Sequence, residues 1–282
     1  MKPLGAGRSS SSGSRTTLAS RQAVSRIIAV ANQKGGVGKT DLTVNLSCQL
    51  ASLGNKVLLI DLDPQANATD YLFQPDVHHG KTVADLLLDD SVTFADVVVN
   101  NCRENLDVIP SHQSLSSTQI RLANDINMQF KLKKKLRAIT EGDRDYDYVV
   151  IDTPPSLGLL MVNTLTAASD VIIPVQTHYF AMDGLVQLRE TIQKVREDIN
   201  PSLKILGAVL TMYDRRTVIS REVSEKIREE FDGRVFNTFI PVNVRLAEAP
   251  SHHKSIFEYD PGCAGAKAYR DLAKEILDCR DA

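Results

Sequence analysis

One stretch constrains the fold of this 282-residue chain more than any other: residues 26–50, which read RIIAVANQKGGVGKTDLTVNLSCQL. An apolar, β-branched run leads into a glycine-rich loop, a Lys-Thr pair and a segment with helical spacing. Strand, glycine loop and helix in this order are typical of a phosphate-binding loop, in which backbone N–H groups and the helix N-terminus surround phosphate oxygens. The stretch therefore predicts a phosphate site at the end of a buried strand.

The positions within the loop predict which residues bind the nucleotide. Glycines let the backbone amides turn inward around the phosphates. Lys39 is expected to reach the β- and γ-phosphates, and the Thr40 hydroxyl is expected to ligate Mg²⁺. The strict pattern has glycine where this chain has Gln33, and its spacing is otherwise intact. The predicted nucleotide-binding residues are Lys34, Gly35, Gly36, Val37, Gly38, Lys39, Thr40 and Asp41.

Strand-like and helix-like segments alternate along the rest of the chain. Their near-continuous apolar runs fit parallel strands that are buried on both faces. The alternation predicts an α/β fold, with one domain over residues 26–282 built on a mostly parallel sheet flanked by helices. Further strands are predicted at 56–62, 106–110, 146–152, 170–175, 203–210 and 235–241, and further helices at 114–139, 184–199, 218–231 and 265–278.

Composition narrows the class of protein. Residues 1–25 are rich in Ser, Gly and Arg and contain no acid, so we expect a disordered tail there. The formal net charge of -2 argues against wholesale coating of nucleic acid but allows a local basic patch. No apolar run approaches the roughly 18 residues of a membrane span. The four scattered cysteines fit free thiols in a reducing compartment, so we expect a cytoplasmic protein.

Three acids lie where predicted strands end. Asp61 and Asp63 follow the strand at 56–62, and residues two apart on a strand share a face, so both could point at the phosphate loop. One acid can organise Mg²⁺ with its waters while the other orients an attacking water. Asp152 ends the apolar strand YDYVVID and is expected near Mg²⁺. The predicted metal set is Thr40, Asp61 and Asp152, the last two through water.

The loop K-G-G-V-G-K-T resembles the deviant Walker A loop of the ParA/MinD ATPases. DLDPQANAT, IDTPPSLGLL, VIIPVQTHYFAMDGL and NVRLAEAPSHHKSIFEYDP resemble partition ATPases of the ParA or Soj type, over residues 26–278. The resemblance implies a P-loop NTPase fold that hydrolyses ATP to ADP and phosphate with Mg²⁺. It implies that Lys34 reaches across an ATP-sandwich homodimer and that Asp63 positions the hydrolytic water. The catalytic residues expected on this basis are Lys34, Lys39 and Asp63.

The resemblance also implies partners. Partition ATPases bind double-stranded DNA non-specifically as ATP dimers on the nucleoid and are stimulated by a ParB/Spo0J-like protein. It assigns DNA contacts to Arg216 and Arg245, which would touch phosphates without reading bases. The basic run at 131–137 is either a further DNA contact or a solvated helix face. MinD proteins end in a basic amphipathic membrane helix, whereas this chain ends AKEILDCRDA, so no membrane anchor is expected.

Asp41 departs from the family pattern, which usually has Thr or Ser at this position next to the α-phosphate. A carboxylate about 4 Å from a phosphate charge would repel it by about 1–4 kcal/mol. The acid can turn away and pair with a base, or act through the waters of Mg²⁺. One alternative function follows from this acid: a nucleotide-binding switch with little turnover because of Asp41. A second alternative rests on the shared fold: a small-molecule ATP-dependent ligase.

Overall fold

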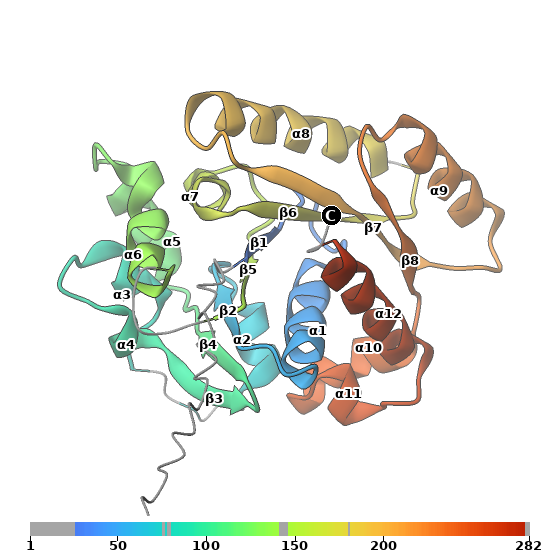
Figure 1. The fold of residues 1–282 in the computed structure, drawn as a ribbon, viewed down its shortest axis with the longest axis horizontal. Coiled ribbons are helices and arrows are strands. Elements are labelled where there is room, and N and C mark those ends of the chain that lie inside the picture. The colour runs from blue at the N-terminus through green and yellow to red at the C-terminus, as the bar shows by residue number, and fades with distance from the viewer. Residues whose placement is uncertain (1–25, 75–76, 78–79, 141–145, 180, 280–282) are drawn as a thin grey trace, which may run out of the picture.

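A computed structural model of the protein describes residues 26–74, 77, 80–140, 146–179 and 181–279. Its centre is an eight-stranded sheet with the order β3-β4-β2-β5-β1-β6-β7-β8 (Figure 1). Neighbouring strands are parallel except β3 and β4, so the predicted fold class is confirmed. The strands are β1 (Arg26–Val30), β2 (Val57–Asp61), β3 (Val99–Arg103), β4 (Leu106–Ile109), β5 (Tyr148–Asp152), β6 (Asp170–Gln176), β7 (Lys204–Tyr213) and β8 (Val235–Pro241).

Helices cover both faces of this sheet (Figure 1). The first half of the chain forms α1 (Lys39–Ser52), α2 (Asn67–Leu72), α3 (Val83–Leu88), α4 (Phe94–Val97), α5 (Leu115–Leu122), the 3₁₀ helix η1 (Met128–Phe130) and α6 (Lys131–Thr140). The second half forms α7 (Leu159–Ala167), α8 (Ala181–Asp198), α9 (Val218–Glu230), α10 (Val244–Glu248), η2 (Ala249–His252), α11 (Ile256–Tyr259) and α12 (Ala264–Asp278). Within the part of the chain described, no helix combines the length and apolar character needed to cross a bilayer.

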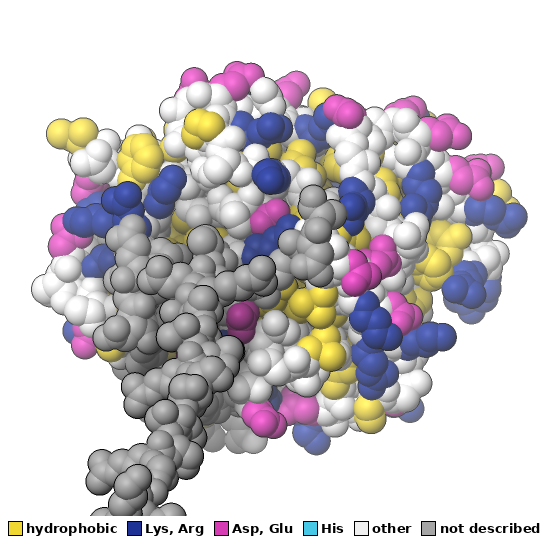
Figure 2. Space-filling view, in the orientation of Figure 1, with side chains coloured by type: hydrophobic (Ala, Val, Ile, Leu, Met, Phe, Trp, Pro, Cys, Tyr) yellow, Lys and Arg dark blue, Asp and Glu magenta, His cyan; other side chains and the backbone are white. Residues whose placement is uncertain are grey.

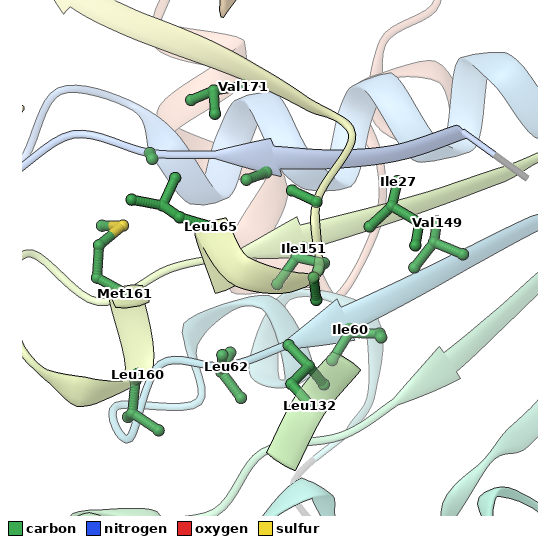
Figure 3. Packing of buried hydrophobic residues seen from close by; sticks show 14 of the residues in the cluster. Ile27, Ile60, Leu62, Leu132, Val149, Ile151, Leu160, Met161, Leu165 and Val171 are labelled. Atoms are coloured by element: carbon green, nitrogen blue, oxygen red, sulfur yellow. The ribbon is translucent and has the colours of Figure 1, made fainter. Parts of the chain in front are cut away.

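Successive residues of the central strands point to opposite faces of the sheet and pack into two separate hydrophobic cores. On β1, Ile27 belongs to the core beneath α6, α7, α8 and α9, whereas Ile28 belongs to the core beneath α1, α2 and α12. Figure 3 shows part of the first core, where Ile27 and Val149 of neighbouring strands lie side by side. Burial on both faces explains the unbroken apolar runs in the sequence.

The single helix expected over 114–139 is wrong, because α5, a turn, the 3₁₀ helix η1 and α6 occupy this segment. Between α5 and α6 the Asn127 amide donates to Asp125 Oδ1 (2.9 Å), and the Lys131 ammonium pairs with Asp125 (2.8 Å). Such local bonds from an aspartate compete with helical backbone bonds.

Strand β3 was not predicted either, since its sequence VNNCR is mostly polar and lies at the edge of the sheet. The expected tail at 1–25 lies outside the described residues.

The basic run at 131–137 is largely used inside the molecule. The Lys135 ammonium donates to the carbonyls of Asp89 (2.9 Å) and Val92 (2.6 Å), just after α3 ends. Lys134 and Lys131 also lie near the Asp90 carboxylate, at 3.7 and 3.8 Å. These contacts hold α6 against the loop that follows α3, so three of the lysines in the run have partners within the chain.

Two backbone amides of the edge strand β8 donate hydrogen bonds to one carboxylate. Glu275 of α12 accepts hydrogen bonds from Asn237 N (2.9 Å) and Thr238 N (2.7 Å), and also from the Thr238 hydroxyl. Helix α12 packs along the same strand. Backbone donors of a strand that has a neighbour on only one side are thereby given a partner from a helix.

Candidate nucleotide-binding site

The glycine loop connects β1 to α1 at the carboxyl end of the sheet. Gly36 (φ 70°) and Gly38 (φ 82°) adopt the left-handed conformation, which side chains other than glycine disfavour. Gly38 directly precedes the first residue of α1, so the loop surrounds a helix N-terminus. A cavity of about 260 Å³ lies there, lined by Gly35, Gly36, Gly38, Lys39, Thr40, Asp41, Asp63, Asn67, Pro155 and Met212.

The two lysines of the loop lie differently. Lys39 lines the cavity, is 7% exposed, and its ammonium donates to the Lys34 carbonyl across the loop (3.1 Å). Burial lowers the pKa of Lys39, while Asp152 and Asp63 oppose that shift. Lys34 is half-buried and is not among the described residues that line the cavity. Its backbone amide donates to Asn32 Oδ1 (2.9 Å), and its Cβ lies at the start of α8 near Gly184.

Asp152 lies beneath the loop as a fully buried acceptor. The hydroxyls of Thr40 (2.8 Å) and Thr43 (3.1 Å) donate to its two oxygens. In the sheet Asp152 is the register partner of Asp61. Burial, and then the neighbouring Asp61 charge, raise the pKa of Asp152 well above its ordinary range. Because burial and the Asp61 charge disfavour the ionised form of Asp152, a cation that binds next to Thr40 would stabilise that form.

Asp61 and Asp63 do not share one face of the site, because β2 ends at Asp61. The Asp61 carboxylate turns inward, where it accepts from Asp63 N (3.1 Å), Thr69 N (2.8 Å) and the Thr69 hydroxyl (2.7 Å). Asp63, in contrast, lines the cavity. Its Oδ1 accepts from Gln65 N (2.9 Å), and its carbonyl accepts from the Ser111 hydroxyl (2.7 Å). The structure thus brings Asp63, rather than Asp61, to the wall of the phosphate cavity.

A second cavity of about 310 Å³ adjoins the first and shares Gly38, Asp41 and Met212 with it. Its walls are mainly apolar, with polar groups from Gln176 and Asn243. An apolar cleft with a few polar groups is the usual environment of a nucleobase or another small ligand. Its remaining lining residues are Thr211, Ile240, Pro241, Val242, Leu246, Ala247 and Tyr269.

Several residues of these walls were missed by the sequence analysis. Met212 lines both cavities at the end of β7 and has a positive φ of 50°, a conformation that costs energy for a side chain with a Cβ. Asn67 begins α2, and Ala66 before it has φ 54°. Their only signal in the sequence was position, since they lie just beyond predicted strands, where ligands of parallel sheets bind.

Asp41 lies at the junction of the two cavities, near Tyr71 of α2, whose hydroxyl accepts a hydrogen bond from Asn45 Nδ2 (3.2 Å). Burial raises the pKa of Asp41 to about 6, although Tyr71 opposes that shift. No basic side chain among the described residues forms an ion pair with it, and its Oδ1 is buried without a hydrogen-bond partner there. The group beside Asp41 in this structure is therefore a phenol rather than a base.

The residues present fit a nucleoside triphosphate with Mg²⁺. The loop offers inward-turning amides and the Lys39 ammonium to phosphates, and Thr40 offers a hydroxyl beside the buried Asp152. Mg²⁺ in such sites takes one or two protein oxygens and completes its shell with phosphate oxygens and water. The described residues hold no group of three or more His, Cys, Asp or Glu side chains arranged around a metal position.

Arg216 and Arg245, the residues assigned to DNA, lie beyond the carboxyl ends of the neighbouring strands β7 and β8. Arg216 is in the loop before α9, and its side chain is 85% exposed. Arg245 is the second residue of α10, and its side chain is 53% exposed. The fold therefore brings both guanidinium groups to one end of the sheet.

Comparisons with known proteins identify relatives of this chain. The chain matches a family model described as an AAA domain over residues 25–205. It is 47% identical to the sporulation initiation inhibitor protein Soj of Bacillus subtilis, over 89% of this chain and 98% of that protein. It is 44% identical to the chromosome partitioning protein ParA of Caulobacter vibrioides, over 89% of this chain and 94% of that protein.

Solved structures share the fold. A cobyrinic acid a,c-diamide synthase from Mycobacterium smegmatis, with bound ATP analog and magnesium, matches with a TM-score of 0.79 and 35% identity, over 92% of this chain and 97% of that chain. A putative plasmid partition protein from Borrelia burgdorferi, bound to AMPPNP, matches with a TM-score of 0.76 and 26% identity, over 91% of this chain and 99% of that chain.

Proposed function

Because the chain belongs to the Soj/ParA family of chromosome-partitioning ATPases, we propose that it is an ATP-driven DNA partition protein that switches between monomer and dimer. It is an ATP-hydrolysing enzyme, and two of its relatives are named chromosome-partitioning ATPases. In the proposal, two ATP-bound subunits face each other and bind double-stranded DNA without sequence preference. A ParB-like partner then stimulates hydrolysis in the cytoplasm, on the nucleoid.

The observation that carries this proposal is the arrangement around the phosphate cavity. Lys39, Thr40 and Asp63 line it together, as a site for phosphoryl transfer requires. In the proposed site, Lys39 and the loop amides hold the phosphates, and Thr40 with Asp152 holds Mg²⁺, which neutralises charge on the phosphate oxygens when bound. Asp61 remains a proposed outer ligand through water, and its bonds to Asp63 N and Thr69 also position the Asp63 loop. Lys34 is proposed to serve the partner subunit's nucleotide.

Two measurements test the function as a whole. Phosphate release from ATP should be slow for the protein alone and should rise when DNA and a ParB-like partner are added. A gel shift on random-sequence duplex DNA should appear with ATP and not with ADP. Turnover without any response to DNA, or equal shifts with both nucleotides, would contradict the partition mechanism.

Asp63→Ala should separate binding from hydrolysis. We expect ATP affinity close to that of the parent, because Lys39 and the loop amides remain, and turnover lower by about 100-fold or more, because no other group orients the water. The variant should accumulate as an ATP dimer on DNA. Glu222→Ala, which removes an exposed acid of α9 that does not line the cavity, is the control. Parent-like hydrolysis in Asp63→Ala would show that another residue positions the water.

Asp41→Thr should tighten ATP binding. The carboxylate lies beside both cavities without a basic partner, so its charge opposes the phosphates. Because burial raises the pKa of Asp41 to about 6, the acid can escape the repulsion near pH 7 by taking a proton at a cost of about 1.4 kcal/mol, so we expect about tenfold tighter binding. Titration calorimetry on the parent, Asp41→Thr and the isosteric Asp41→Asn measures this effect. Weaker binding in both variants would instead mean that Asp41 organises the Mg²⁺ shell.

A second candidate function has one observation in its favour: the similarity to the structure named as a cobyrinic acid a,c-diamide synthase, at 35% identity. On that reading ATP would drive ligation on a small molecule, and the apolar cavity beside the phosphate site would hold part of that substrate. The two readings differ in their response to nucleic acid. ATP turnover that responds to a small carboxylic acid and ignores DNA would favour the ligase.

A further inference from the structure

The face that carries Arg216 and Arg245 surrounds a groove of about 790 Å³. The groove lies between the loop after β7, the loop after β8 and the first turns of α12, and its charged walls include Arg215, Arg216 and Lys267. Figure 2 shows dark blue Lys and Arg side chains directly beside magenta Asp and Glu over α10 and α12. Cations and carboxylates are therefore mixed on this surface.

Arg216 is held by its near neighbour Asp214. Its Nε donates to Asp214 Oδ1 (2.9 Å) and its Nη2 to Oδ2 (2.8 Å), and the Arg216 backbone amide donates to the same carboxylate (3.0 Å). These hydrogen bonds lower the pKa of Asp214 to about 2, so the acid is charged at any physiological pH. The Nε and Nη2 atoms of a guanidinium can donate together to two oxygens of one phosphate group. In Arg216 both atoms already donate to Asp214.

Arg245 is flanked by two acids. Its Nη1 donates to Glu248 Oε2 (2.9 Å), and its Nε lies 3.5 Å from Asp260 Oδ2. The same Glu248 oxygen accepts from the Tyr259 hydroxyl (2.9 Å), which fixes the glutamate in place. Hydrogen bonds from Tyr259 and then Arg245 lower the pKa of Glu248, so this acid also stays charged.

Cations and carboxylates lie close together on this face. Arg215 stacks over the Phe239 ring, 5.0 Å from its centroid, and Lys267 lines the groove. Asp214 pairs with Arg216, Glu248 and Asp260 pair with Arg245, and Asp271 pairs with Lys274 (3.7 Å). A phosphate that approaches Arg216 or Arg245 would therefore meet a carboxylate beside each of them.

We propose that Asp214 and Glu248 limit the affinity of this face for a DNA backbone, an inference that rests on the proposed DNA binding. Each acid occupies donors that a phosphate would otherwise take, and each repels the phosphate by its charge. Exposed ion pairs are weak, so an arginine can leave its acid for DNA, but the acid's repulsion remains. Salt screens that repulsion, so the limit is largest at low ionic strength.

The test compares Asp214→Asn, Glu248→Gln and the double variant with the parent. Fluorescence anisotropy of a labelled random-sequence duplex, with ATP present, is measured over a series of salt concentrations. We expect each single change to tighten binding about threefold to tenfold at low salt, and the double change to multiply these gains. The salt slope should steepen by about 1 for each arginine that gains a phosphate. ATP affinity and the melting temperature should stay unchanged.

Asp232→Asn is the matched control, because it also removes one exposed acid from an Arg–Asp pair, with Arg189 at 3.0 Å. That pair joins α8 to the turn after α9, beside a different groove. We expect its DNA affinity to match the parent. If DNA affinity rises equally in the control, the gain comes from the change in net charge alone, and the proposal is overturned.

The remaining outcomes separate the proposal from the function on which it rests. If the parent binds DNA and both variants bind equally or more weakly, the acids orient the arginines rather than restrain them, and the proposal is overturned. If neither the parent nor any variant binds DNA at any salt concentration, the proposed DNA binding itself fails. DNA binding that appears only in the variants would support the restraint directly.

Discussion

Lys39→Ala is expected to reduce ATP binding below detection. The Lys39 ammonium is the only side-chain cation among the described residues that line the phosphate cavity, so the variant has no group to replace it. Each charge-assisted hydrogen bond to a phosphate contributes about 1.5–3 kcal/mol, so two lost bonds weaken binding by about 100-fold to 10,000-fold. Calorimetric titration of ATP with Mg²⁺ measures the loss directly.

The variant needs a check on its fold, because the ammonium also bonds to the Lys34 carbonyl. Circular dichroism and thermal melting should remain close to the parent, since the sheet and both cores are built elsewhere. Lys204→Ala, which removes an exposed lysine at the start of β7, is the matched change of charge and should bind ATP normally. Unchanged ATP affinity in a folded Lys39→Ala protein would mean that Lys39 does not bind the phosphates of ATP.

Lys34→Ala is expected to spare ATP binding by the monomer and to abolish dimerisation, turnover and DNA affinity together. Lys34 does not line its own cavity in the described residues, and its Cβ lies at the rim near the start of α8. From there an ammonium can offset repulsion between the phosphates of two facing subunits and stabilise charge that develops on hydrolysis. DNA affinity falls because two weak surfaces no longer act as one bivalent surface.

Sedimentation with ATP counts the subunits, and titration of nucleotide at low protein concentration isolates the monomer. Lys56→Ala changes the same charge at the opposite end of the sheet, before β2 begins, and should dimerise like the parent. A Lys34→Ala protein that dimerises normally with ATP would refute the role in trans. Loss of ATP binding by the monomer would instead place Lys34 in its own subunit's site.

The sequence predicted the parts of this molecule that depend on local pattern. The loop between β1 and α1 follows from glycine spacing, and the parallel strands follow from apolar runs that need cover on both faces. The ion pair between Arg245 and Glu248 is three residues apart on a helix, so it too was within reach of local reasoning.

Contacts between distant segments could not be predicted in this way. Met212 meets Asp41 across the two cavities only because β7 and α1 end at the same edge of the sheet. The hydrogen bond from Asn45 to the Tyr71 hydroxyl joins α1 to α2 and brings the phenol near Asp41, and no spacing in the sequence distinguishes a tyrosine that does this. The inward turn of Asp61 depends on Thr69, eight residues away, so strand periodicity misjudged its direction.

The Glu275 carboxylate accepts hydrogen bonds from two backbone amides of β8, and this affects how crowded copies of the protein can associate. If the proposed DNA binding gathers many copies along one duplex, the exposed edges of their sheets meet repeatedly. An open border would act as a template on which another copy could add its own strand, and such growth has no natural end. Here Asn237 N and Thr238 N are already engaged by the chain's own helix. These two amides are therefore not available to a strand of a neighbouring copy.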